Sequence, residues 1–270
     1  MKGSKFALHY AAPDDPNGGL TLTTKGVTGG QEIPLTYGFG GLNTKIALKA
    51  PQLNGYTAFK INSADFDKLP DILKGPIAIT ESDANGKLLD ATSVQAWGAL
   101  DDLYASSASS ATLGVSYAKD APTLSLWAPT AKSVALHLYD DSKTTADKTI
   151  GMTFDAKTGI WSAAGDASWT NKFYLYEVHV YAPSTHKLET NMVTDPYSIS
   201  LSMNSTRSQI INFADPSLMP DGWQTLAKPD LKSPTDIVLY ELHVRDFSIS
   251  DQTVPEKYRG KYMAFTVSDS

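Results

Sequence analysis

Short segments of strand-like residues, separated by turn-forming residues, recur through the sequence. In the second half they are Thr123–Pro129, Ser133–Tyr139, Thr149–Phe154, Gly159–Ser162 and Phe173–Tyr181. The first 110 residues carry the same pattern in Phe6–Tyr10, Leu20–Thr23, Lys45–Lys49 and Ala58–Ile61. Strands at intervals of about 8–12 residues are typical of an antiparallel sandwich. The spacing therefore predicts a mainly β fold with two immunoglobulin-like β-sandwich domains.

A different pattern follows near the end of the sequence. Apolar residues stand at nearly every position of one short segment, at Ile237, Val238, Leu239, Leu242 and Val244. A run without alternation is typical of a parallel strand that is covered on both faces. Only 23 residues follow Phe247, so we expect this strand to be the beginning of a larger structure.

Composition excludes several classes of protein. Of the 270 residues, 41% are apolar and 19% are charged, and no apolar run of about 18 residues could span a membrane. The net charge of −6 and the scattered lysines argue against nucleic acid as a partner. The absence of cysteine excludes disulfides and thiol catalysis. No signal peptide is visible after Met1, and the compartment stays open, with an extracellular or cell-surface bacterial location favoured over the cytoplasm.

Several motifs carry a family resemblance. The motifs Leu126-Trp-Ala-Pro-Thr-Ala131, Gly159-Ile-Trp161, Tyr176-Glu-Val178 and Val193-Thr-Asp-Pro-Tyr197 resemble the isoamylase-type N-terminal module that precedes debranching barrels. The segment Tyr240–Phe247, together with Ala99–Tyr104, is similar to pullulanases and limit dextrinases, the α-1,6-glucosidases of the α-amylase superfamily. The resemblance covers most of the chain.

This resemblance implies a domain organisation and a function. Residues 1–112 would form an N-terminal pullulanase-type β-sandwich. Residues 113–235 would form an isoamylase-type carbohydrate-binding-like β-sandwich with a wrapping connection, and residues 236–270 the first strand of an incomplete (β/α)8 barrel. The chain would be the non-catalytic N-terminal region of a starch-debranching enzyme, truncated after the first barrel strand. Its whole form would hydrolyse α-1,6-glucosidic linkages in pullulan, amylopectin and limit dextrins.

No catalytic residue is expected in this chain. Retaining hydrolysis needs two carboxyl groups about 5–5.5 Å apart, and in the family these lie on later barrel strands. The adjacent acids Asp101 and Asp102, and Glu241 with Asp246, are expected to face solvent or to pair with basic residues. No cofactor is expected. No metal site is expected either, because the histidines lack i, i+4 spacing and the segment Glu81–Gly86 is explained by a hairpin turn.

Aromatic residues are the candidates for sugar binding, because flat rings stack on glucose faces. The candidates are Trp127, Trp161, Trp169 and Tyr181. The alternative is that Trp127 and Trp161, which lie within strands, fill the sandwich core. Glycogen-binding relatives carry tryptophans at positions that here correspond to Tyr139–Asp141 and Lys187–Glu189, where none is present. We therefore expect weak binding of α-glucan (starch, glycogen, pullulan) at best.

Two other functions remain as alternatives. The chain could be a free-standing α-glucan (starch or glycogen) binding protein, or a structural pair of sandwiches. A free-standing binding protein does not explain a terminal apolar strand that needs neighbours. A structural pair does not explain the combination of Leu126–Pro129 with Asp195-Pro-Tyr197. An unpaired strand of this kind predicts self-association through its edge.

Overall fold

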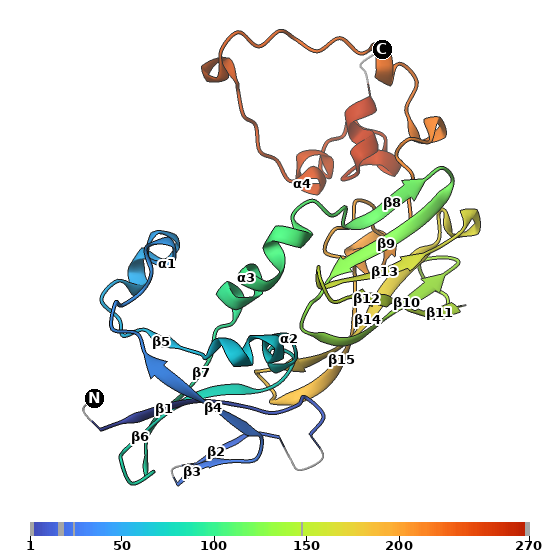
Figure 1. Ribbon diagram of the computed structural model, residues 1–270. Helices are drawn as coiled ribbons and strands as arrows, with labels where there is room; N and C mark the ends of the chain where they lie inside the picture. The colour runs from blue at the N-terminus through green and yellow to red at the C-terminus, as the bar shows by residue number, and fades with distance from the viewer. Residues whose placement is uncertain (1–2, 16–18, 24, 147, 268–270) are drawn as a thin grey trace. The chain divides into compact units, whose positions relative to one another are not determined.

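The computed structural model describes residues 3–15, 19–23, 25–146 and 148–267. The chain divides into two compact units, residues 1–215 and 216–270. The first unit holds two β-rich portions in succession (Figure 1). No helix within the described ranges has the length and apolar character required to cross a membrane.

The N-terminal portion is built on a sheet of order β5-β4-β1-β6-β7, in which every neighbouring pair is antiparallel. A separate hairpin joins β2 and β3. The strands are β1 (Lys5–Tyr10), β2 (Thr21–Thr23), β3 (Gly26–Thr28), β4 (Gln31–Tyr37), β5 (Phe59–Lys60), β6 (Ile77–Ser82) and β7 (Leu88–Ser93). The α-helices are α1 (Thr44–Lys49), α2 (Leu69–Ile72) and α3 (Trp97–Ala108). Short 3-10 helices span Pro51–Leu53 and Ser63–Lys68.

The core of this portion is small. Leu8 of β1 lies opposite Ile33 of β4 and Ile79 of β6 in the sheet. Leu8, Ile33 and Ile72 of α2 form its buried cluster, and partly buried apolar side chains pack around them. Leu8 and its partners therefore lie on the sheet face that packs against α2, and Ala7 and His9 lie on the other face.

One local prediction is wrong in this portion. Lys45–Lys49, predicted as a strand, lies in helix α1, which begins after Asn43, whose side chain accepts a hydrogen bond from the Ile46 N–H at 2.9 Å. Such a cap satisfies a helix donor that an isolated strand would leave to solvent. Helix α3 extends to Ala108, and the Ser107 hydroxyl donates to the Lys157 carbonyl at 2.8 Å.

The second portion is an antiparallel sandwich of two sheets, which confirms the predicted fold class for this region. One sheet has the order β11-β10-β14-β15, with β16 also paired to β14, and the other has the order β12-β13-β9-β8. The strands are β8 (Gly114–Ala118), β9 (Ala121–Trp127), β10 (Ala131–Tyr139), β11 (Lys148–Gly151), β12 (Thr153–Asp155), β13 (Ile160–Ala164), β14 (Phe173–Ala182), β15 (Lys187–Val193) and β16 (Ser208–Gln209). Short 3-10 helices span Ala167–Trp169 and Met203–Ser205.

A buried carboxylate attaches the connection after β15 to the core of the sandwich. Asp195 Oδ2 accepts hydrogen bonds from the hydroxyls of Tyr174, at 2.7 Å, and Tyr176, at 3.3 Å. The Tyr197 N–H donates to Asp195 Oδ1 at 2.8 Å, and the Asp195 N–H donates to Ser208 Oγ at 2.9 Å. Tyr174, Tyr176 and Ser208 are fully buried. The Asp195-Pro-Tyr197 motif therefore has a structural role.

The second unit differs from the predicted barrel strand. Its elements are helix α4 (Val244–Ser248) and 3-10 helices at Pro216–Leu218, Trp223–Thr225, Pro234–Asp236, Glu256–Tyr258 and Tyr262–Thr266. The segment between Ile237 and His243 has extended backbone at both ends but pairs with no strand among the described residues. Leu239 is 90% exposed. A parallel strand needs neighbours for its N–H and C=O groups, and these neighbours are missing from the described part of this unit.

Candidate functional site

The outer face of the sheet β11-β10-β14-β15 presents a group of polar side chains. Alternation along β14 directs Tyr174 and Tyr176 into the core, so that Glu177, His179 and Tyr181 lie on the opposite face. These three side chains are half-buried. Polar residues at every second position of a strand are typical of a sheet face that meets solvent or a ligand.

Hydrogen bonds connect side chains from all four strands of this sheet. The Oγ1 of Thr149 on β11 lies 3.2 Å from His137 Nδ1 on β10, and His137 Nε2 lies 3.0 Å from Glu177 Oε2. On the other side of the carboxylate, His179 Nε2 lies 3.5 Å from Glu177 Oε1 and 3.0 Å from Thr190 Oγ1 on β15. We call Thr149, His137, Glu177, His179 and Thr190 the polar row.

Apolar groups lie on the same face beside the polar row. Leu175 is the sheet partner of His137, Met192 is the partner of Glu177, and Leu188 is the partner of Tyr181. Sugars bind where apolar or aromatic surface meets their rings and polar side chains exchange hydrogen bonds with their hydroxyls. The arrangement on this face supplies both kinds of group.

Tyr181 stands where this face ends in a groove. A cavity of about 360 Å³ is lined by Tyr181, His186 and Leu188 on one side and by Ala12 and Pro13 of the N-terminal portion on the other. The Tyr181 hydroxyl lies 3.4 Å from His186 Nδ1. Burial raises the pKa of Tyr181, so its hydroxyl stays neutral and can donate to a ligand.

Trp161 and Trp169, two of the predicted sugar-binding residues, belong to the sandwich core. Trp161 is 8% exposed, its ring centroid is 4.8 Å from that of Phe154, and its Nε1 donates to the Ala128 carbonyl at 3.0 Å. Trp169 is 4% exposed, and Gly165 lies so close that a Cβ there would be 2.4 Å from the indole. Neither indole face is open to a sugar. The burial of Trp161 agrees with the core alternative, which did not include Trp169.

Trp127 and Tyr181, the other two candidates, are half-buried and belong to opposite sheets. Trp127 ends β9, and its Nε1 donates to the Thr158 carbonyl at 3.0 Å. Only Tyr181 lies on the face that carries the polar row. The alternation of His137, Glu177 and His179 within strands is the sequence signal for this face.

The candidate acids are partnered or exposed. Asp101 lies on α3 with its Oδ2 3.8 Å from Lys49 Nζ, and Asp246 Oδ1 accepts from Arg245 Nη1 at 3.0 Å. Within the described ranges, no group of three histidine, aspartate or glutamate side chains is placed to hold a metal ion. The polar row therefore remains the candidate site.

Comparison with known families places two domains on this chain. Residues 2–102 match the Pullulanase N2 domain. Residues 112–198 match carbohydrate-binding module 48, the isoamylase N-terminal domain. The polar row and Tyr181 all lie within the second match.

Similar proteins span the whole of this architecture. Pullulanase 1 of Arabidopsis thaliana, a chloroplastic protein, is 38% identical over 255 residues, which cover 93% of this chain and 26% of the relative. The pullulanase of Klebsiella pneumoniae is 39% identical over 237 residues, which cover 85% of this chain and 21% of the relative. A crystal structure of Klebsiella pneumoniae pullulanase complexed with maltotriose matches with a TM-score of 0.86 and 33% identity, covering 97% of this chain and 24% of that chain.

The chain spans about a quarter of the length of these relatives. Along this chain the match to the N2 domain is followed by the match to module 48, and the solved pullulanase has the same fold as this chain. This chain therefore belongs to the pullulanase family, of which it represents the region with the N2 domain and carbohydrate-binding module 48.

Proposed function

We propose that this region holds α-glucan for a starch-debranching enzyme, on the outer face of its second sandwich. The observation that carries the proposal is the polar row, which places a carboxylate, two imidazoles and two hydroxyls beside Tyr181 and apolar side chains. The match to a carbohydrate-binding module supports it. The Klebsiella pneumoniae relative, which is complexed with maltotriose, gives the class of ligand.

Binding at this face is expected to be weak. No tryptophan stands in the two turns where glycogen-binding relatives have one. In the first turn, the Tyr139 ring is already covered by the Arg207 guanidinium, 3.6 Å from its centroid. Arg207 in turn donates to the carbonyls of Asp141 and Thr144 at 2.7 and 2.6 Å. The residues that replace the tryptophan platform are therefore engaged in contacts of the protein itself.

The whole enzyme is proposed to hydrolyse α-1,6-glucosidic linkages in pullulan, amylopectin and limit dextrins. This proposal rests on the family and on the order of its two domains. A free-standing glucan-binding protein would use the same face of the same sandwich. The proposal favours the enzyme because the relatives that share both domains are named pullulanases.

The test is affinity electrophoresis of the chain through gels containing amylopectin. We expect slight retardation of the wild type and its loss in Tyr181→Ala and His179→Ala, because each removes a group from the outer face. Tyr262→Ala, an exposed tyrosine of the second unit, is the matched control and should migrate as the wild type does. Retardation that persists in both outer-face variants would contradict the proposed site.

We also propose that the segment Ile237–Leu242 mediates self-association. Its apolar side chains are exposed, and its backbone pairs with no strand among the described residues. Unpaired extended edges with apolar side chains tend to pair with another chain.

Deletion of residues 236–270 should reduce self-association and leave both β-rich portions folded. Sedimentation velocity over a concentration series measures the first effect, and thermal melting measures the second. A matched variant of the full chain has Val238 and Leu239 replaced by serine. It retains the backbone of the segment and removes two of its apolar groups. A fall in melting temperature of more than about 5 °C on deletion, about 1 kcal/mol or more of lost contact, would show that the segment is part of the fold.

A further inference from the structure

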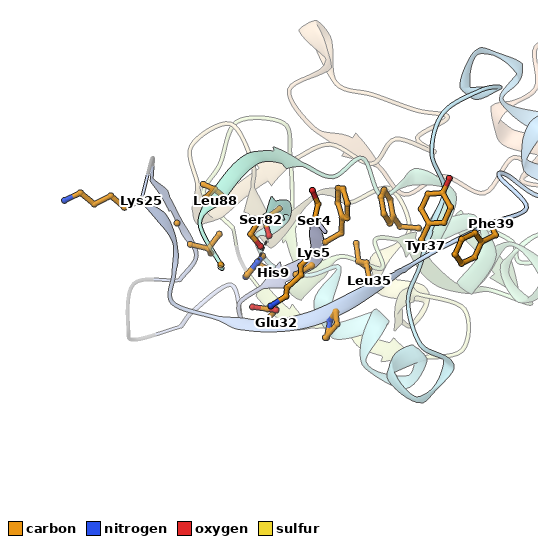
Figure 2. A pocket seen from close by; sticks show the side chains of 18 residues that line it. Ser4, Lys5, His9, Lys25, Glu32, Leu35, Tyr37, Phe39, Ser82 and Leu88 are labelled. Atoms are coloured by element: carbon orange, nitrogen blue, oxygen red, sulfur yellow. Dashed lines mark hydrogen bonds between the residues drawn. The ribbon is translucent and has the colours of Figure 1, made fainter. Parts of the chain in front are cut away.

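The sheet of the N-terminal portion borders a cavity of about 940 Å³. Side chains of β1, β4, β5 and β6 line it, together with residues of the β2–β3 hairpin and of the turn before β7 (Figure 2). Its volume lies within the range of small-molecule and oligosaccharide pockets. No residue of the second sandwich lines it, so it is separate from the polar row.

Four aromatic rings follow one another along this cavity. The ring centroids of Phe6 and Phe59 are 4.1 Å apart, those of Phe59 and Tyr37 are 6.1 Å apart, and those of Tyr37 and Phe39 are 4.8 Å apart. Figure 2 shows Tyr37 and Phe39 side by side at one end of the lining. We call these four residues the ring row.

The ring row lies outside the core of its own domain. The buried cluster of this portion is made by other residues, and Phe39 is 93% exposed. Tyr37 is also exposed, whereas Phe6 and Phe59 are half-buried. Contiguous exposed apolar surface marks a binding site more often than single exposed residues do. The exposed rings of Tyr37 and Phe39 therefore are not explained by the packing of the described part of the domain.

Polar side chains line the rest of the cavity. His9 Nε2 lies 2.8 Å from Thr80 Oγ1, and Lys5 and Glu32 stand beside them (Figure 2). Alternation along β1 puts Lys5 and His9 on the sheet face opposite Phe6, so the lining continues from one face to the other at this end of the sheet.

We propose that the ring row is a second carbohydrate site, at which the exposed rings of Tyr37 and Phe39 bind a glucose unit of an α-glucan. These two rings meet edge to face, with an interplanar angle of 78°. The choice of α-glucan as ligand rests on the proposed function, whereas the site itself rests on the ring row and its cavity. With a site on each β-rich portion, one glucan chain could bind at both sites, or two chains could bind at one site each. When one chain binds at both, the first contact raises its effective concentration at the second site.

Hydrogen–deuterium exchange of the full chain, with and without maltoheptaose, locates binding. We expect slower exchange in residues 34–41, at the ring row, and separately in residues 176–190, at the outer face. Protection at 176–190 alone would overturn the ring-row site and leave the proposed function standing. Protection at 34–41 alone would do the reverse, and protection at neither would contradict both.

Calorimetric titration with maltoheptaose then tests the rings in a Tyr181→Ala background, in which only the ring row remains. Phe39→Ala and Tyr37→Ala should each weaken binding about five- to tenfold, because each removes one stacking face. Phe39→Tyr should restore it. Leu48→Ala, another exposed apolar residue of this portion, is the matched control. Unchanged affinity in Phe39→Ala, with the fold verified by circular dichroism, would overturn the proposal.

Discussion

Trp161→Ala is expected to lower the free energy of unfolding by about 3–5 kcal/mol, because it empties a large volume in the core of the second sandwich. The indole packs on Phe154 from β12 and donates to the Ala128 carbonyl beyond β9. Its removal leaves a cavity and a buried carbonyl without its donor. The cavity and the carbonyl without its donor both lie between the two sheets, so the whole sandwich should be less stable.

Urea denaturation followed by far-ultraviolet circular dichroism measures this loss. Trp97→Ala is the matched control, since Trp97 is 52% exposed at the first turn of α3, and should cost less than about 1 kcal/mol. Affinity electrophoresis below the unfolding transition separates stability from binding. A Trp161→Ala protein of normal stability that no longer binds amylopectin would show that this residue is a sugar platform after all.

Asp195→Ala is expected to be the second large effect. It removes the acceptor of the Tyr174 and Tyr176 hydroxyls and of the Tyr197 N–H. Each buried hydroxyl left without an acceptor costs about 1–3 kcal/mol, and the expected total loss is about 2–5 kcal/mol. Asp195→Asn keeps one acceptor oxygen and should lose less. A loss in Asp195→Ala no larger than in an exposed aspartate variant such as Asp221→Ala would contradict the structural role of the motif.

The pKa of Asp195 leads to a prediction about how the stability of the protein depends on pH. Burial raises the pKa of the Asp195 carboxyl above its ordinary value of 3.8, and the hydrogen bonds from Tyr174, Tyr197 and Tyr176 offset part of that rise. Because the native pKa is above the unfolded one, the stability from this group is complete below the unfolded pKa. It is lost as pH rises through the native pKa. The melting temperature of the wild type minus that of Asp195→Asn should therefore decrease from about pH 4 upward.

Comparing the melting temperatures of the wild type and Asp195→Asn separates the effect of Asp195 from that of carboxyl groups whose pKa is lowered. Hydrogen bonds from Ser168 lower the pKa of Asp166, and those from Thr158 and Lys157 lower the pKa of Asp155. These carboxylates contribute stability above their ordinary pKa and lose it as pH falls. They are unchanged in Asp195→Asn and cancel in the comparison. A difference that stays constant across the titration would show that the pKa of Asp195 is not raised.

Local sequence patterns were sufficient to predict a strand where the alternation with a period of two continues over many residues. The nine residues of β10 and the ten of β14 alternate over enough positions for the strand to be recognised. The five residues of Lys45–Lys49 are too few to separate a strand from one turn of helix, and the Asn43 cap decided for the helix. In Ile237–Leu242 the pattern of a buried strand is present, but pairing requires neighbours, and the described residues supply none.

The sequence by itself determined the mainly β class, the sandwich of the second portion and the family, because strand periodicity and short motifs are local properties. Which side chains meet on a face was decided only by the tertiary structure. The polar row unites residues 137, 149, 177, 179 and 190 through the register of four strands, and the ring row unites residues 6, 37, 39 and 59. The same reason explains the tryptophans: a strand pattern gives two faces, but it does not say that Trp161 points between the sheets. That direction follows from the packing of one sheet on the other.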